Sequence, residues 1–310
     1  MKKLFKGLLF FSLMMVLLVG CSTKAPQTSD SKKEDKKDDT VKIGLSISTL
    51  NNPFFVSLKE GAEAEAKAKG ADIIVVDAQN DSAKQVSDIE DLIQKGIDVL
   101  LVNPTDSAAV TAAIESANSA NIPVITVDRS AEGGEVVAHI ASDNVAGGKM
   151  AGDFILEKLE KKGKVVELEG IAGSSAARER GEGFHKSIDP VSDIKVVAKQ
   201  AADFDRAKGL SVMENILQAN KDIKAVFAHN DEMALGAVEA LEAAGLKDVI
   251  VVGFDANEDA VKAVEAGTMA ATVAQKPTII GQQGVTTAIK VAAGEKVDKF
   301  IPVALELIKK

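Results

Sequence analysis

From residue 41 onward, short apolar runs rich in β-branched residues alternate with longer stretches rich in Ala, Lys and Glu. Ten runs of four to six residues have the composition of buried strands. The expected strands cover residues 43–48, 73–77, 99–102, 124–128, 136–141, 165–168, 196–199, 225–228, 249–254 and 271–274. The stretches between them carry helical spacing, as in 55–69, 83–95 and 108–120, and end at Gly70, Gly96 or the turn at 121–123.

This alternation predicts an α/β fold with parallel strands, right-handed crossovers and helices on both faces of each sheet. A series of ten strands is too long for one compact sheet of usual width, so we expect two similar lobes. The first would hold the strands up to about Ser142, and the second those from Lys164 to Ala274. The stretch 277–310 predicts one further helix and one strand, which we expect to return to the first lobe.

The first forty residues follow a different pattern. Three lysines precede an apolar run at 7–20, whose fourteen residues fall short of the ~20 that span a bilayer, so we expect a signal peptide over 1–20. The run ends in LVGC at 18–21, which resembles a bacterial lipobox and predicts lipidation of Cys21. Residues 22–40 are almost entirely polar, and we expect a flexible tether of roughly 25 Å over 21–40.

The charge balance narrows the range of partners. The chain has 310 residues, with 37 Lys plus Arg against 46 Asp plus Glu, a formal net charge of −9. Nucleic-acid-binding proteins present a basic surface, so no nucleic-acid partner is expected. One Cys excludes a disulfide scaffold, and His139, His185 and His229 lack the spacing of metal ligands, so no metal is expected.

An enzymatic function has little support in the sequence. No Walker A string or GxGxxG follows the first expected strand, so no nucleotide cofactor or other cofactor is expected. Beyond Cys21 there is no Cys nucleophile, and no Ser/His/Asp set can be assigned from spacing, so we expect no catalytic residues. Asp128 and Asp255 resemble an acid–base pair, but we expect the neighbouring arginines to keep both ionised. A binding protein is the preferred interpretation, with a sugar-processing enzyme as the rival.

Polar and aromatic residues gather directly after the expected strands. In open α/β sheets, ligands bind outside the carboxyl ends of the strands, so these positions are candidates for a binding site. The candidates are Asn52, Phe54, Phe55, Asn103, Asp128, Arg129, Arg178, Arg180, Phe204, Asn230, Asp255 and Gln275. They come from both expected lobes, which predicts a cleft lined from two sides.

The chemistry of this set favours a neutral sugar. Sugar hydroxyls donate and accept hydrogen bonds, so they suit carboxylates, guanidinium groups and amides together. Aromatic rings cover the apolar C–H faces of a sugar at little entropic cost. Two Asp and two or three Arg leave no large net charge in the site, which disfavours a phosphate or carboxylate ligand.

Several of these residues also have a simpler explanation. Phe54 and Phe55 would equally seat the first helix on its sheet, and Asn52 is an N-cap as well as a candidate ligand. The run Arg178-Glu179-Arg180 has the composition of a solvent-exposed helix face. If the helix places one of its two arginines toward the cleft, we expect that arginine to be Arg180. Three aspartates are expected to act only as helix caps, Asp106, Asp205 and Asp231. Three phenylalanines are expected in the core, Phe184, Phe227 and Phe300.

Eight segments of the chain resemble the ribose-binding members of the type I periplasmic solute-binding family. They are STLNNPFF at 48–55, VNPTDS at 102–107, IPVITVDR at 122–129, HIASDN at 139–144, SAARERGEGF at 175–184, ADFDR at 202–206, HNDEMALGA at 229–237 and VVGFDA at 251–256. The resemblance covers essentially all of 41–310. It implies two Rossmann-like lobes with parallel sheets, joined by a hinge of three segments near 142–144, 274–276 and 304–306.

The resemblance also implies domain limits and roles. The N-terminal lobe would comprise 41–142 plus 276–304, and the C-terminal lobe 143–275 plus 305–310. Seven residues would hydrogen-bond the sugar, namely Asn52, Asp128, Arg129, Arg180, Asn230, Asp255 and Gln275. Phe54, Phe55 and Phe204 would pack against its ring. Asn103 and Arg178 are second-tier candidates for sugar binding.

The resemblance implies a monomeric, extracytoplasmic binder of D-ribose that delivers the sugar to an ABC permease with a cytoplasmic ATPase. The lipobox and tether add a lipid anchor at the outer face of the cytoplasmic membrane and suggest a Gram-positive cell. Alternatives that stay open are another neutral sugar, such as allose, galactose or a furanosyl signal, and a sensor input that reports sugar to a membrane receptor.

Overall fold

The computed structural model describes residues 40–310, and the expected signal peptide and tether lie outside these residues, apart from Thr40. The first lobe is built on a sheet in the order β11-β5-β4-β3-β1-β2, in which every pairing is parallel. Its strands are β1 (Lys42–Ile47), β2 (Asp72–Asp77), β3 (Val99–Val102), β4 (Val124–Val127), β5 (Ala138–Ser142) and β11 (Phe300–Val303).

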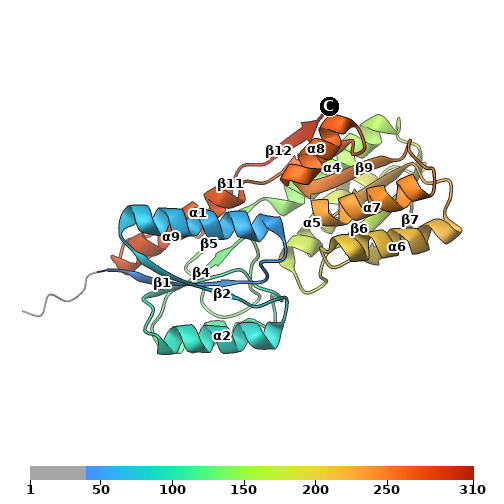
Figure 1. Cartoon of the computed structure of the whole chain (residues 1–310). Helices are drawn as coiled ribbons and strands as arrows, with labels where there is room; N and C mark the ends of the chain where they lie inside the picture. The colour runs from blue at the N-terminus through green and yellow to red at the C-terminus, as the bar shows by residue number, and fades with distance from the viewer. Residues whose placement is uncertain (1–39) are drawn as a thin grey trace, which may run out of the picture. The chain divides into compact units, whose positions relative to one another are not determined.

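Helices cover both faces of this sheet. They are α1 (Pro53–Lys69), α2 (Ser82–Gln94), α3 (Thr111–Ser119) and α9 (Pro277–Ala292). The pair α1 and α9 shares one apolar core with the sheet, and α2 and α3 share the other, as the positions of α1 and α2 in Figure 1 show.

The second lobe repeats the pattern with the sheet order β12-β10-β9-β8-β6-β7. Its strands are β6 (Gly163–Glu169), β7 (Ile194–Ala201), β8 (Ala225–Ala228), β9 (Ile250–Asp255), β10 (Ala271–Ala274) and β12 (Glu306–Lys309), of which only β12 is antiparallel to its neighbour. Its helices are α4 (Asn144–Lys158), α5 (Ser175–Ile188), α6 (Arg206–Ala219), α7 (Asp231–Ala243) and α8 (Glu258–Ala266). The α4–α5 pair covers one face, and α6, α7 and α8 cover the other.

The chain passes between the two sheets three times: between β5 and α4, between β10 and α9, and between β11 and β12. The two-lobed α/β fold with three connections is therefore confirmed. All ten expected strands are present, each within two residues of the expected ends. The C-terminal prediction was wrong in one respect, because 277–310 forms a helix and two strands, and β12 joins the second sheet by pairing with β10.

Glycines allow α4 and α5 to pack backbone against backbone. A Cβ added at Gly148 would lie 2.0 Å from the Arg180 carbonyl oxygen, and one at Gly183 would lie 2.0 Å from that of Val145. Real Cβ atoms do not approach a carbonyl so closely, so the helix contact requires glycine at both positions. This contact fixes the position of Arg180 along α5 relative to the first turns of α4.

The core holds two of the three phenylalanines expected there. Phe184 and Phe227 are fully buried and stack with ring centroids 4.8 Å apart. The expectation for Phe300 was wrong, because it lies on the edge strand β11 with 46% of its surface exposed.

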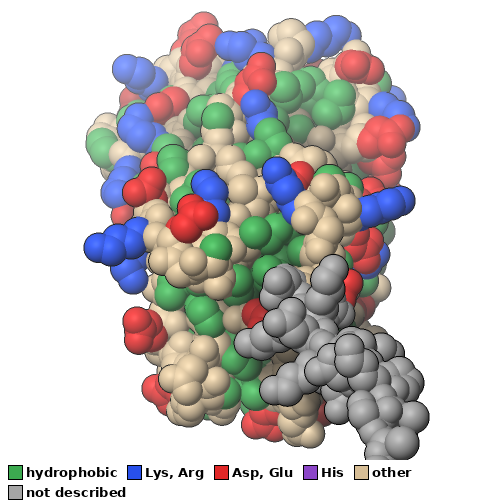
Figure 2. Space-filling model, turned by 90° about the vertical axis from the view of Figure 1, so that its left-hand side faces the viewer, with side chains coloured by type: hydrophobic (Ala, Val, Ile, Leu, Met, Phe, Trp, Pro, Cys, Tyr) green, Lys and Arg blue, Asp and Glu red, His purple; other side chains and the backbone are tan. Residues whose placement is uncertain are grey.

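Charges of both signs are interspersed on the face shown in Figure 2 rather than gathered into a basic patch. Within residues 40–310, no helix combines the length and apolar character needed to cross a bilayer. Among the same residues, no group of three His, Cys, Asp or Glu side chains is arranged to hold a metal ion.

Candidate functional site

A cavity of about 230 Å³, partly open to solvent, lies between the lobes where the strands of both sheets end. Its lining residues are Asn52, Phe54, Phe55, Asp128, Arg129, Ala176, Arg180, Phe204, Asn230 and Asp255. Nine of the ten first-rank candidates are thus brought together, and Gln275 is the one that does not line the cavity.

The lobes touch each other around the cavity. The Ser107 amide donates to the Gly173 carbonyl at 2.9 Å, and the Ser130 amide donates to Ser175 Oγ at 2.9 Å. Arg178 Nη2 donates to Glu132 Oε1 at 2.8 Å, and both side chains are about half exposed. Arg178 is therefore a surface contact between the lobes and not part of the cavity wall.

Two helix starts deliver amide side chains to the cavity. Asn52 is the N-cap of α1, where its Oδ1 accepts from the Phe54 amide at 2.9 Å and Pro53 occupies the first helical position. Asn230 caps α7 in the same way, accepting from the Met233 amide at 3.0 Å. The cap orients each side chain, so both roles suggested for Asn52 are compatible.

Three cavity residues have backbone conformations that favour glycine. The φ angles are 62° at Asp128, 61° at Phe204 and 114° at Asp255. Such conformations cost about 1–3 kcal/mol each in non-glycine residues and concentrate at functional sites. Gly170 makes room for Phe204, since a Cβ there would lie 2.1 Å from the phenyl ring.

Each lobe contributes one buried carboxylate–guanidinium pair. Asp128 Oδ2 lies 3.7 Å from Arg129 Nε in the first lobe, and Asp255 Oδ1 lies 3.6 Å from Arg180 Nη1 in the second. All four side chains are at most 4% exposed. The site therefore balances two negative groups with two positive ones.

An amide side chain supports each carboxylate from behind. Asn103 Nδ2 donates to Asp128 Oδ2 at 3.2 Å, and Gln275 Nε2 donates to Asp255 Oδ1 at 3.0 Å. Asn103, like Gln275, does not line the cavity. The two amides thus have equivalent places in the two lobes, although the sequence alone ranked them differently.

Aromatic rings enclose the guanidinium groups. Arg129 lies over the Phe55 ring at 5.0 Å and over the Phe204 ring at 5.1 Å, so rings from both lobes hold it. Arg180 lies 3.9 Å from the Phe254 ring centroid. Phe54 and Phe55 meet edge to face at 5.1 Å and belong to the core of the first lobe. Both suggested roles for these phenylalanines, helix seating and cavity lining, hold in the structure.

Several buried polar atoms at the site lack a hydrogen-bond partner within the protein. Among residues 40–310, the buried unpartnered atoms include Asp128 Oδ1, Arg129 Nε and Gln275 Oε1, and Asp128 and Arg129 are the only charged side chains in that set. An unpaired buried polar group costs about 1–3 kcal/mol, and more when charged. The site therefore suits a ligand that both donates and accepts hydrogen bonds.

Burial changes the ionisation of the carboxylates. It raises the pKa of Asp255 to about 7, although Arg180 opposes the shift, and it also raises the pKa of Asp128. Burial lowers the pKa of Arg129 to about 10. The expectation that the arginines keep both aspartates ionised is therefore wrong for Asp255, because the loss of hydration outweighs the attraction of the guanidinium groups.

Asp231 was expected to be a helix cap, and this was wrong. The cap of α7 is Asn230, and Asp231 is fully buried beneath it. Its carboxylate accepts from the Asn257 amide and the Thr272 hydroxyl, both at 2.7 Å. Burial, followed by the charge of Asp255, raises its pKa well above the usual value.

The other two aspartates do cap backbone amides. Asp205 is the N-cap of α6, and Asp106 accepts from the amides of Ala108 and Ala109 at 2.9 and 2.8 Å. Sequence reasoning missed one lining residue, Ala176, because an alanine carries no chemical signal of its own.

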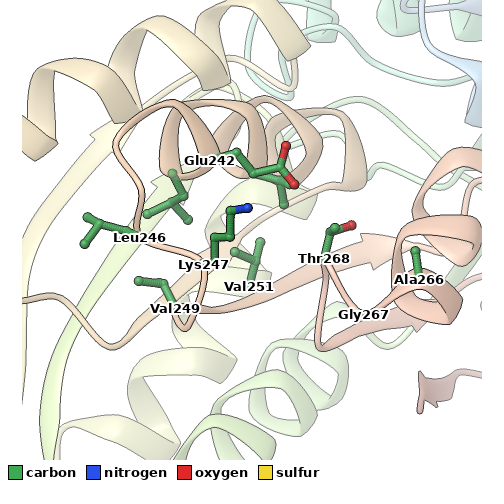
Figure 3. Close-up of a pocket in the computed structure, with 10 residues that line it drawn as sticks. Glu242, Leu246, Lys247, Val249, Val251, Ala266, Gly267 and Thr268 are labelled. Carbon is green, nitrogen blue, oxygen red and sulfur yellow. The ribbon is translucent and has the colours of Figure 1, made fainter.

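A second hollow lies in the second lobe, near the opposite end of β9 from Asp255. It has about 610 Å³ of space, part of it open to solvent, and Figure 3 shows it between the helix that carries Glu242 and the loop that carries Thr268. Its floor is apolar, with Leu246 and Val251 among its residues. It has no buried charge pair and contains none of the candidate residues.

Comparison with known proteins places the chain in a family. A model described as "Periplasmic binding protein domain" matches residues 43–296. The ribose import binding protein RbsB of Bacillus subtilis is 56% identical over 308 residues, which cover 99% of each chain. The protein of the same name from Escherichia coli is 58% identical over 268 residues, 86% of this chain and 90% of that one.

Solved structures agree with these matches. A solute-binding protein of an ABC transporter from Mycobacterium smegmatis, with bound glycerol, superposes with a TM-score of 0.84 at 38% identity, covering 87% of this chain and 94% of the other. The fold, the position of the cavity and these matches together show that the chain belongs to the type I periplasmic binding protein family.

Proposed function

We propose that this protein captures D-ribose outside the cytoplasm, between two closing lobes, and delivers it to an ABC importer. The single observation that carries the proposal is the buried set of two carboxyl and two guanidinium groups in the cleft, some of whose polar atoms have no hydrogen-bond partner in the protein. The matched relatives, named as ribose import binding proteins at 56 and 58% identity, support ribose over other sugars.

The roles of the lining residues follow from their chemistry. Asp128 and Asp255 accept hydrogen bonds from sugar hydroxyls, while Arg129 and Arg180 donate to hydroxyl and ring oxygens. Asn52 and Asn230 complete the polar contacts, and Phe54, Phe55 and Phe204 cover the apolar faces of the ring. Gln275 and Asn103 act mainly through the aspartates that they hold.

Binding then stabilises the closed arrangement of the lobes. A ligand shifts an open–closed equilibrium only as far as its contacts differ between the two states. A sugar that touches Asp128 in one lobe and Asp255 in the other makes its full set of contacts only when the lobes meet. The closed, loaded form is the one that the importer recognises.

We also propose that the mature protein is a monomer held at the outer face of the cytoplasmic membrane by a lipid on Cys21. The anchor rests on the lipobox and the polar tether in the sequence, and the monomeric state rests on the resemblance to the family alone. Mass spectrometry of the mature protein from the membrane fraction should show Cys21 as the first residue, carrying a diacylglyceryl group on its sulfur. An unmodified Cys21 in that fraction would refute the proposed anchor.

Isothermal titration calorimetry tests the proposed ligand. Ribose should bind one to one, and allose and galactose should bind more weakly. If either hexose binds more tightly than ribose, the protein serves another sugar. NMR of ribose incubated with the protein tests the enzymatic rival, because a binder returns the sugar unchanged.

A further inference from the structure

Asn144 lies beside the cavity without lining it, and apart from its place in the first expected hinge segment it has no assigned role so far. It is the first residue of α4, two positions after β5 ends and directly after the first connection between the lobes. Its surface is 2% exposed, so both ends of its amide need partners within the protein.

The two ends of this amide meet two charged groups on α5. Asn144 Oδ1 accepts from Arg180 Nε at 2.9 Å, and Asn144 Nδ2 donates to Glu179 Oε2 at 3.1 Å. A guanidinium group only donates, so the carbonyl end of the amide must face Arg180. Glu179 accepts at the other end and thereby fixes the amide in this orientation.

Arg180 is held on further sides as well. Its Nη1 donates to the His229 carbonyl at 2.6 Å, and its guanidinium group lies over the Phe254 ring. Among residues 40–310, no hydrogen bond ties down Nη2. The guanidinium group is therefore fixed through Nε and Nη1, and Nη2 keeps its hydrogens for a ligand.

The support behind His229 is equally firm. Its Nε2 lies 2.9 Å from Oε1 of Glu167, and both side chains are fully buried. The close backbone packing at Gly148 sets the spacing of α4 from α5 at the level of Arg180. Of all these supports, Asn144 alone contacts Nε of Arg180, the atom that sets the plane of the group.

We propose that Asn144 is a positioning residue for sugar binding: it holds the guanidinium plane of Arg180 so that Nη2 meets the ligand, and it links this arginine to the first connection between the lobes. The proposal rests on the proposed sugar-binding function of the cleft. Gln275, at the second connection, holds Asp255 in a corresponding way. Arg180 and Asp255 are thus each hydrogen-bonded to a side-chain amide, of Asn144 and of Gln275, that lies next to a chain connection between the two lobes.

Calorimetry of ribose binding to Asn144→Ala tests the proposal. Loss of one orienting hydrogen bond to a charged group should weaken binding about 10–100-fold. Asn144→Asp combined with Glu179→Gln keeps an acceptor for Arg180 Nε and gives the second oxygen of residue 144 an amide donor, so this double variant should recover most of the loss. Asn220→Ala, which removes another side-chain amide in the second lobe, should bind as the parent does.

Repeating the Asn144→Ala substitution in an Arg180→Lys protein distinguishes a positioning role from a general disturbance of the fold. Lys has no guanidinium plane to orient, so adding Asn144→Ala to Arg180→Lys should weaken binding by less than about threefold, measured at millimolar ribose. Equal losses in both backgrounds, or unchanged affinity in Asn144→Ala, would overturn the proposal. If Asn144→Ala shows no cooperative unfolding, Asn144→Ser replaces it with the same expected loss. Absence of ribose binding by the parent protein would instead refute the proposed function.

Discussion

The affinity for ribose should fall as the pH is lowered through 7, and Asp255 should cause the change. This carboxyl is 6% exposed and its pKa is raised to about 7. It faces Arg180 directly, with Arg129, Asp128 and Asp231 as the further charged or titratable neighbours. As a carboxylate it accepts hydrogen bonds from sugar hydroxyls, whereas the protonated form has lost part of that capacity.

The expected size follows from linkage. Below pH 7 the ligand-free protein holds a proton on Asp255, and binding to the ionised form must release it, so the apparent Kd grows by the factor 1 + 10^(pKa − pH). With a pKa of about 7, the Kd should rise roughly 90-fold between pH 8 and pH 5. Asp128 also has a raised pKa, so its protonation would act in the same direction.

Calorimetry across this pH range measures the effect. Titrations in two buffers with different ionisation enthalpies should show release of up to one proton per ribose between pH 5 and pH 7. Thermal unfolding at pH 5 checks that the lobes stay folded, and Arg178→Ala should keep the parent profile. An affinity that stays within threefold from pH 8 to pH 5, or that rises on acidification, would refute the reasoning.

Three further predictions concern single residues. Arg180→Ala should weaken ribose binding at least about 100-fold in calorimetry, because it leaves Asp255 buried without its partner. Arg178→Ala should change the ribose affinity less than about threefold, and equal effects of the two variants would contradict the placement of the two arginines. Gly173→Ala should weaken ribose binding about 10-fold and show more open lobes in small-angle scattering, because the added Cβ would lie 1.9 Å from Asp106 Oδ2 across the cleft. Adding Asp106→Ala should restore the affinity and the closed arrangement, and failure to do so would exclude this clash as the cause. Gly148→Ala should lower the free energy of unfolding by about 1–3 kcal/mol in urea titrations, because its Cβ would lie 2.0 Å from a carbonyl oxygen; unchanged stability would show that α4 and α5 separate easily.

The strands of this fold could be predicted from sequence because they are covered on both faces. A buried parallel strand such as Val99–Val102 consists of apolar residues only, and the first two helices end at recognisable signals, Gly70 and Gly96. The cavity residues could be predicted for a related reason. Parallel strands end at one edge, so polar groups placed after each strand converge there.

What could not be predicted depends on contacts between distant segments. Gln275 and Asn103 follow their strands as the lining residues do, and only the folded chain shows that they bond to carboxylates instead of lining the cavity. The raised pKa of Asp255 and the burial of Asp231 come from packing that no local pattern encodes. Phe300 is apolar but lies on an edge strand, which sequence periodicity does not reveal.

Residues 300–309 complete both sheets, and this constrains the order of folding. β11 adds the edge strand of the first sheet, and β12 adds that of the second. Domains generally form as units while the chain emerges from the ribosome, N-terminal units first. Here neither lobe has all its strands until residues 300–309 are synthesised, so the N-terminal half cannot reach its final structure ahead of the rest. A nascent chain truncated before residue 300 would therefore remain unfinished in both halves.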